Sequence, residues 1–170
     1  MQRDLLESTR AELLAQIAGL SEEQLNWKPT PSSWSIAQVV EHIAMAEDSI
    51  ARLIPIGLAQ PPTYTERELG LDQSIPDRST KLQAPARLDP SQVAMSPAQL
   101  VSLLIQCRAR TIAILDSMTD SDSDRLSKTS PPHPHQLLGP MSTRQWIDAI
   151  PLHERRHIKQ IVELKEGFPS

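Results

Sequence analysis

The 170-residue sequence predicts an all-α fold, a four-helix bundle with long proline-rich connections. Four segments, about 2–18, 35–55, 96–118 and 142–166, repeat apolar residues at helical spacing. No segment alternates apolar and polar residues as a half-buried strand does, and there is no glycine-rich phosphate loop. Long helices joined by long connections are typical of helix bundles, and the length suits a single domain over 1–170.

The first half of the chain contains clear helix boundaries. The first predicted helix, residues 2–18, ends at Gly19. A capping box, Ser21-Glu-Glu-Gln24, opens a short helical piece after it. A second capping box, Ser35-Ile-Ala-Gln38, starts the second long helix, which Pro55 is expected to end or kink. The expected inner faces of the two long helices are Leu6, Leu13, Leu14 and Ile17, then Ile36, Val39, Val40, Ile43, Ala46, Ile50 and Ile54.

The connection after the second helix is too long to be ordinary. Residues 59–95 show no sustained period and hold five prolines, so we expect an excursion, a lid or a mobile loop. Ser96 and Pro97 then suit the N-cap and the first position of a third helix. Its expected inner face is Leu100, Leu103, Leu104, Cys107, Thr111, Ile114, Leu115 and Met118.

The last quarter of the chain predicts a loop followed by a long helix. The loop, 119–140, is polar and rich in proline. The helix should start at Ser142 or Thr143 and end before Gly167. Pro151 lies inside it, off the apolar face, and should bend it because proline removes one backbone hydrogen bond.

Composition argues against several classes of protein. The net charge of −4 and a pI near 5.7, with no basic block, argue against nucleic acid as a partner. The single cysteine excludes an intrachain disulfide and fits a reducing compartment. The N-terminus has no signal-peptide core, and no apolar run approaches the roughly 18 residues of a membrane-spanning helix. We therefore expect a cytoplasmic protein that binds neither nucleic acid nor membrane.

The most informative motif is His153-Glu-Arg-Arg-His157 in the fourth helix. Residues four apart project from one helix face, about one turn from each other. This face also carries Trp146, Ile150 and Ile161, so both imidazoles should point into the protein. Buried imidazoles need partners, and a single transition metal would satisfy both. The alternative is a pair of core histidines that form hydrogen bonds with neighbouring groups.

A third metal ligand would have to come from another helix. His42 lies at the edge of the apolar face of the second helix, about 100° from Ile43, where a helix–helix seam is expected. Three imidazole nitrogens leave coordination positions open for water or substrate, and imidazole suits zinc, nickel, iron or copper. Weaker candidates are His133 and His135 in the loop and Cys107, which should behave as a small buried hydrophobe.

Two stretches of the chain resemble the signatures of one family. Trp27-Lys-Pro, followed by Trp34-Ser-Ile-Ala-Gln-Val-Val-Glu-His42-Ile-Ala, resembles the second-helix signature of the DinB-like bundles, which include the YfiT-like proteins. Leu138-Gly-Pro-Met-Ser-Thr-Arg-Gln-Trp146, followed by His153-Glu-Arg-Arg-His157-Ile-Lys-Gln160, resembles the fourth-helix signature. The resemblance spans nearly the whole chain in the same order. It implies a four-helix bundle that holds a divalent metal on His42, His153 and His157.

The resemblance also implies a function. It suggests a metal-dependent hydrolase, or an S-transferase that uses a low-molecular-weight thiol, acting on a small-molecule substrate. Zinc or nickel is the expected metal, with iron or manganese as alternatives. The open side of the site should face a pocket lined by the bundle seam and by residues near 131–140. A homodimer is expected because bundles of this family often pair. The competing hypothesis is a non-catalytic, stress-related metalloprotein whose metal ties two helices together.

No residue is assigned a catalytic role. Gln160 shares the histidine face and has two open roles, orienting a ligand or forming a hydrogen bond with a neighbouring helix. Glu41 and Glu154 adjoin histidines in sequence but point about 100° away. For Glu154 a solvated helix face is favoured over a general-base role. Arg155 and Arg156 are expected at the surface.

Overall fold

The computed structural model describes residues 2–79 and 83–169 as an all-helical protein. The described residues contain no strand, only an isolated bridge between His135 and Gly139, so the predicted all-α fold is confirmed. Four long helices form the bundle: α1 (Gln2–Ile17), α3 (Ile36–Leu58), α5 (Pro97–Asp116) and α7 (Thr143–Glu166). Short helices lie in the connections: α2 (Glu22–Asn26), α4 (Leu71–Ser74), η1 (Ala86–Leu88) and α6 (Asp120–Arg125).

Capping boxes define where most helices begin. α2, α3, α5 and α7 each begin with an N-cap serine and have a glutamine three residues later. The serine hydroxyl accepts a hydrogen bond from the backbone N–H of that glutamine, and the glutamine side chain accepts one from the backbone N–H of the serine. These bonds satisfy amide groups that a helix start leaves free. The starts predicted at Ser21, Ser35, Ser96 and Ser142 are therefore confirmed. Thr119 and Asp122 form the same box and begin α6, within a stretch expected to be a loop.

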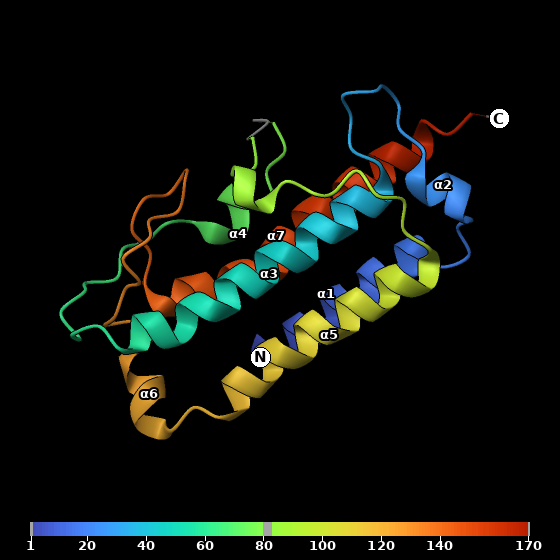
Figure 1. Cartoon of the computed structure of the whole chain (residues 1–170). Helices are drawn as coiled ribbons and strands as arrows, with labels where there is room; N and C mark the ends of the chain where they lie inside the picture. Colours follow the sequence, from blue (N-terminus) through green and yellow to red (C-terminus); the bar gives the residue numbers. More distant parts are fainter. Residues whose placement is uncertain (1, 80–82, 170) are drawn as a thin grey trace.

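The order of helix directions explains the long connection. Figure 1 shows α3 and α5 running one way and α1 and α7 running the other, with α3 packed on both α5 and α7. Because α3 has 23 residues, at about 1.5 Å each, the chain must return roughly 35 Å before α5 can start beside the start of α3. Residues 59–95 make this return. They form a crossover connection rather than a free excursion, although residues 80–82 lie outside the described residues.

The crossover is anchored on the bundle. Ile75 is buried in a core cluster of the bundle. Near the other end, the Ser91 carbonyl accepts a hydrogen bond from Gln38 Nε2 at 2.7 Å. The Ser91 backbone N–H donates to Glu41 Oε2 at 2.9 Å, so Glu41 is half-buried and paired rather than on a solvated face.

We expect crossover amides to exchange with solvent faster than those of α3 and α7. Outside its two short helices, few described N–H groups of the crossover donate to the backbone, and unpaired amides open easily. Tyr64 is an internal control, because its N–H donates to the Lys128 carbonyl at 2.9 Å and should exchange slowly. Hydrogen–deuterium exchange followed by NMR measures both. Uniformly slow exchange through the crossover would contradict the expectation.

Two prolines lie inside long helices without ending them. α3 continues past Pro55 to Leu58, and α7 runs through Pro151 without a break. Pro151 is buried, although it lies off the apolar face predicted from the sequence. Where α3 ends and α7 begins the two helices are very close, since a Cβ at Gly57 would lie 2.2 Å from Thr143 Oγ1. Any larger residue at position 57 would therefore force Thr143 to move.

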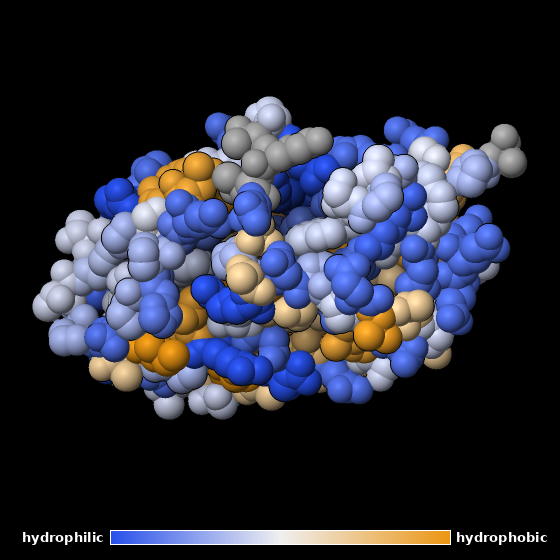
Figure 2. Space-filling view, turned by 45° about the horizontal axis from the view of Figure 1, so that its top comes forward, coloured by the Kyte–Doolittle hydropathy of each residue, from blue (hydrophilic) through white to orange (hydrophobic). Residues whose placement is uncertain are grey.

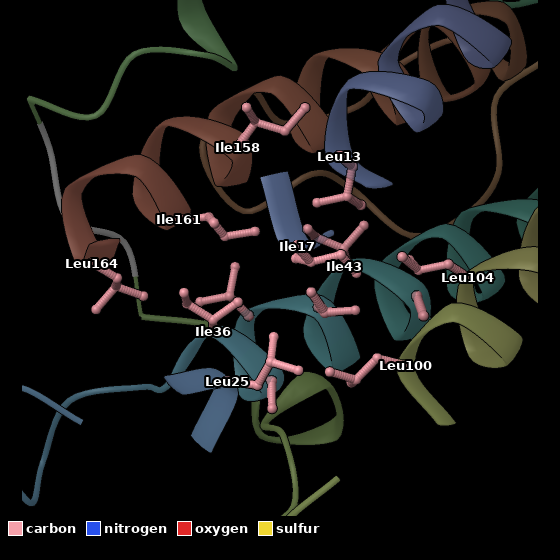
Figure 3. Close-up of a cluster of buried hydrophobic side chains, with 14 of the residues drawn as sticks. Leu13, Ile17, Leu25, Ile36, Ile43, Leu100, Leu104, Ile158, Ile161 and Leu164 are labelled. Carbon is pink, nitrogen blue, oxygen red and sulfur yellow. The ribbon is translucent and has the colours of Figure 1, made fainter. Parts of the chain in front are cut away.

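Two apolar clusters fill most of the bundle. The smaller contains Leu6, Ile50, Ile75, Met141 and Trp146. Burial of such side chains stabilises the fold by about 1.5–3 kcal/mol each. The predicted inner face of α3 is buried throughout, as expected. The larger cluster draws on all four long helices (Figure 3) and includes Leu13, Ile17, Ile36, Ile43, Leu100, Leu104, Ile158, Ile161 and Leu164.

A layer of four charged side chains, one from each long helix, is also buried: Arg10, Glu47, Arg108 and Glu154, at most 8% exposed. We call it the charged layer. Arg10 joins the two carboxylates, with Nη2 2.6 Å from Glu47 Oε2 and Nε 2.6 Å from Glu154 Oε1. Arg108 joins them again, with Nε 2.7 Å from Glu47 Oε1 and Nη2 3.1 Å from Glu154 Oε2.

The charged layer corrects the expectation that Glu154 lies on a solvated face. α7 packs against α3 and also against α1, so a residue about 100° away from the histidines still faces the core. Thr9 Oγ1 donates to Glu154 Oε2 at 2.5 Å. Burial alone would raise the pKa of the Glu47 carboxyl, but hydrogen bonding and charge from Arg108 and Arg10 outweigh it and lower that pKa. The Glu47 carboxylate thus stays ionised and paired with the two arginines.

The visible face of the molecule is mostly hydrophilic, with apolar residues in separate patches (Figure 2). Within the described chain, α5 alone is long and apolar enough to cross a membrane by length and composition. This corrects the expectation that no segment would qualify. In the structure α5 packs along α3 and supplies Arg108 to the charged layer.

Candidate metal centre

Three histidines meet at the seam between α3 and α7. His42 lies about two turns into α3, and His153 and His157 lie one turn apart on α7. One ring nitrogen of each lies within 4.8 Å of the other two. The Nε2 atoms of His153 and His157 are 3.1 Å apart. The structure therefore brings together the three residues proposed as ligands, and no other such group occurs in the described residues.

Hydrogen bonds orient two of the rings. His42 Nδ1 lies 2.9 Å from the Leu88 carbonyl oxygen, and His157 Nδ1 lies 2.8 Å from Gln160 Oε1. Because each oxygen is an acceptor, each Nδ1 carries the ring proton and each Nε2 keeps a free lone pair. Metal-ligating histidines commonly have such partners. Gln160 thus orients the ring of His157, and its Oε1 also accepts a hydrogen bond from Arg78 Nη1 at 3.3 Å.

The donor set fits one divalent ion. Zinc–imidazole bonds of about 2.0–2.1 Å at tetrahedral angles place two nitrogens of a zinc site roughly 3.3–3.4 Å apart. The 3.1 Å separation between the Nε2 atoms of His153 and His157 is close to this distance. Two ring nitrogens this close need a proton or a cation between them, and the nearby His42 nitrogen makes a cation the better partner.

Burial keeps the three imidazoles neutral. It lowers the pKa of His157 from 6.5 to about 3, and the charge of His42 adds to the effect. Burial also places the pKa of His153 well below 6.5, helped by His157. The pKa of His42 is lowered by burial, although its bond to Leu88 opposes the shift. Protons therefore compete weakly with a metal at these nitrogens near neutral pH.

We expect the metal-free protein to lose stability as the pH falls below about 6.5, the ordinary histidine pKa. In the folded protein the pKa of His157 is about 3, so between these two values the unfolded chain binds more protons. The free energy of unfolding should therefore decrease as the pH falls through this window and level off above it. Urea unfolding at pH 7.5 and 5 measures the change, and His157→Gln should show a smaller one. An equal slope in that variant would assign the effect to other groups.

A cavity of about 730 Å³ opens onto the three histidines. Its walls come from α3, α7, the crossover, the loop before α7 and the connection between α2 and α3. The loop contributes His135, Gln136 and Leu137, which confirms the predicted pocket near 131–140. The crossover contributes Arg78 and Asp89, so this segment covers part of the site.

An arginine of the crossover attaches this segment to α7 next to the cavity. Arg78 forms a two-pronged ion pair with Glu163 of α7, with Nε–Oε1 at 2.9 Å and Nη2–Oε2 at 2.7 Å. Arg156 is half-buried and donates from Nη1 to the Ile75 carbonyl at 3.3 Å, so the expectation of a surface charge is wrong for this residue. Arg155 is exposed, as expected.

The weaker ligand candidates lie apart from the cluster. His133 is exposed, and His135 lines the cavity without joining the three histidines. Cys107 is buried and donates from Sγ to the Leu104 carbonyl at 3.3 Å. Burial raises the pKa of its thiol to about 11, with Glu47 adding to the shift, so it behaves as the expected small hydrophobe.

Sequence reasoning missed the Leu88 carbonyl, which orients His42, and the buried carboxylate of Glu47 in the charged layer. The Leu88 contact uses a main-chain carbonyl, which leaves no residue-type signal. Glu47 did leave one, because it lies between Ile43 and Ile50 on an apolar face. A charge inside such a face predicts a buried partner.

Comparisons with known proteins identify the family of this chain. The family model of the DinB superfamily matches residues 5–161. The uncharacterized protein YuaE of Bacillus subtilis (strain 168) is 30% identical over 162 residues, which cover 95% of this chain and 96% of that protein.

Two solved structures share the fold. YfiT from Bacillus subtilis, described as a probable metal-dependent hydrolase with an unusual four-helix bundle topology, has a TM-score of 0.63 and 20% identity, covering 97% of this chain and 84% of YfiT. The four-helix bundle protein TT2238 has a TM-score of 0.61 and 20% identity, covering 95% of this chain and 96% of that one. With the family match over residues 5–161, these findings show that the chain belongs to the DinB superfamily.

Proposed function

We propose that this protein is a metal-dependent hydrolase of small molecules that holds one divalent ion on His42, His153 and His157. The observation that carries the proposal is a cluster of three imidazoles at the wall of a cavity of about 730 Å³. Structural zinc sites are usually closed by four protein ligands, whereas catalytic sites keep three ligands and an open position. The described residues supply three, which favours catalysis over a purely structural metal.

The chain's own groups prepare the site for this chemistry. Leu88 and Gln160 hold the ring protons on Nδ1 of His42 and His157, which leaves Nε2 free to bind an ion. When bound, zinc or nickel would act as a Lewis acid that activates water and polarises a carbonyl group. The description of YfiT supports a hydrolase.

Thiol transfer is the second candidate. The cavity volume lies within the roughly 300–1,000 Å³ of small-molecule sites, so a low-molecular-weight thiol and its acceptor could both enter. A metal ion of this kind also stabilises a thiolate. The two reactions share the ligand set and differ only in the nucleophile.

Turnover by metal-loaded protein tests the proposal. We expect zinc- or nickel-loaded protein to hydrolyse activated esters such as p-nitrophenyl acetate, and a chelator to abolish the rate. His157→Ala is the matched negative variant, and the exposed His133→Ala is the positive control. Conjugation of a small thiol to an electrophile, without ester hydrolysis, would move the assignment to the transferase. Loaded protein that catalyses neither reaction would favour a structural metal.

A further inference from the structure

A fourth imidazole, that of His135, lines the cavity beside the three histidines. Its ring packs 5.5 Å from the ring of Trp146. A positive charge on His135 would lower the pKa of His153, so the two groups are close enough to interact. Its nitrogens nevertheless lie outside the cluster that could share a metal.

Hydrogen bonds fix the tautomer of His135. Its Nδ1 accepts the backbone N–H groups of Leu137 and Leu138, both at 3.2 Å. An accepting nitrogen carries no proton, so the proton of the neutral ring is on Nε2. A proton on Nδ1 would point toward the N–H groups of Leu137 and Leu138, which are also donors. This arrangement therefore disfavours the protonated ring and keeps His135 neutral. Burial lowers the pKa of His135 in the same direction.

The loop that carries His135 is firmly held. His135 N–H donates to the Gly139 carbonyl at 2.7 Å, and Gly139 N–H donates back at 2.9 Å. Gly139 has a φ of 72°, which favours glycine because it has no Cβ. Arg67 and Tyr64 of the crossover both donate to the Pro140 carbonyl, at 2.9 and 3.0 Å. The imidazole is therefore preorganised at the cavity wall.

We propose that His135 Nε2–H is a hydrogen-bond donor for a substrate oxygen that carries or develops negative charge, such as a carboxylate or an acyl oxygen. Among the described residues Nε2 has no partner, and it is not sealed in the interior. A neutral imidazole polarises a carbonyl in this way in other enzymes. The proton stays on Nε2 throughout, and the ring does not act as a base because its lone pair faces Leu137 and Leu138.

This inference rests on the proposed function, because it places the substrate oxygen beside the metal centre. It assigns different roles to the four histidines that line the cavity. His42, His153 and His157 bind the ion, whereas His135 binds the oxygen of the bound molecule. Loss of His135 should therefore leave metal content unchanged and weaken the binding of a carboxylate.

The test compares cobalt(II)-loaded wild type with His135→Ala, His135→Phe, His135→Gln and His133→Ala. Sodium acetate is titrated while the visible cobalt spectrum is recorded. We expect all five proteins to bind one cobalt ion and the affinity for acetate to fall about tenfold in His135→Ala, because a hydrogen bond to a charged group is lost. His135→Phe, which keeps a ring against Trp146, should lose as much affinity. His135→Gln should retain most of it, since its amide N–H replaces Nε2–H, and His133→Ala should match the wild type.

Several results would overturn the inference. Equal acetate affinity in wild type, His135→Ala and His135→Phe would show that His135 donates to no such oxygen. Loss of cobalt from His135→Ala would make His135 a ligand instead. A wild-type spectrum that acetate leaves unchanged would also overturn it, because no carboxylate would then reach the site. The expected acetate pattern without ester hydrolysis in any protein would reject the hydrolase alone. If esters are hydrolysed, kcat/KM of His135→Ala should fall about 100-fold.

Discussion

Replacing His42 with alanine should abolish stoichiometric metal binding. Only three imidazoles converge at the site among the described residues, so this change leaves two ligands from a single helix and removes the link between α3 and α7. The loss should exceed the roughly 10–100-fold decrease in metal affinity that follows removal of a ligand's hydrogen-bond partner. Metal analysis after dialysis against zinc or nickel buffers measures it.

Two further variants calibrate this result. Gln160→Ala keeps all three imidazoles but frees Nδ1 of His157, so its metal affinity should fall by about 10–100-fold and no more. His133→Ala changes an exposed loop residue and should retain one equivalent of metal. Full metal retention in His42→Ala would show that the third ligand has been assigned to the wrong residue.

Replacing Glu154 with alanine should lower the free energy of unfolding by about 3–5 kcal/mol, because removal of one partner of a buried ion pair leaves an uncompensated charge. Glu154 is 1% exposed and pairs with both Arg10 and Arg108. Urea unfolding of the metal-free protein isolates this effect from metal binding. Arg155→Ala, at the exposed neighbouring position, should change stability by less than about 0.5 kcal/mol.

Glu47 gives an independent check of the charged layer. Glu47 lies on α3 and pairs with the same two arginines, so Glu47→Ala should be destabilising to a similar degree. The loss in the double variant should differ from the sum of the two single losses, because both carboxylates pair with the same two arginines. Strictly additive losses would show that the two carboxylates act separately.

The helix starts and the three converging histidines could be predicted because both depend on local spacing. Ser35 and Ser142 lie three residues before a glutamine, and this pattern fixes a helix start whatever packs around it. His153 and His157 share a helix face by geometry alone. His42 was found because the edge of an apolar face marks a seam.

The remaining features depend on which helices are neighbours, and local spacing does not contain that information. Glu154 faces the core because α1 covers the side of α7 opposite the crossover. Leu88 reaches His42 because α3 and α5 run parallel and the chain must return between them. The spacing of residues along the sequence also gives no sign that Arg156 of α7 donates to the Ile75 carbonyl.

If His42 binds a metal ion as proposed, its bond to the Leu88 carbonyl links metal binding thermodynamically to docking of the crossover. If the docked crossover strengthens the grip of His42 on an ion, the ion must stabilise the docked crossover by the same factor. A bound metal ion would then favour the docked state of the crossover. Metal-starved protein would expose η1 more often and become easier to cleave there. Through this coupling, the supply of metal would set how long the protein survives proteolysis as well as its activity.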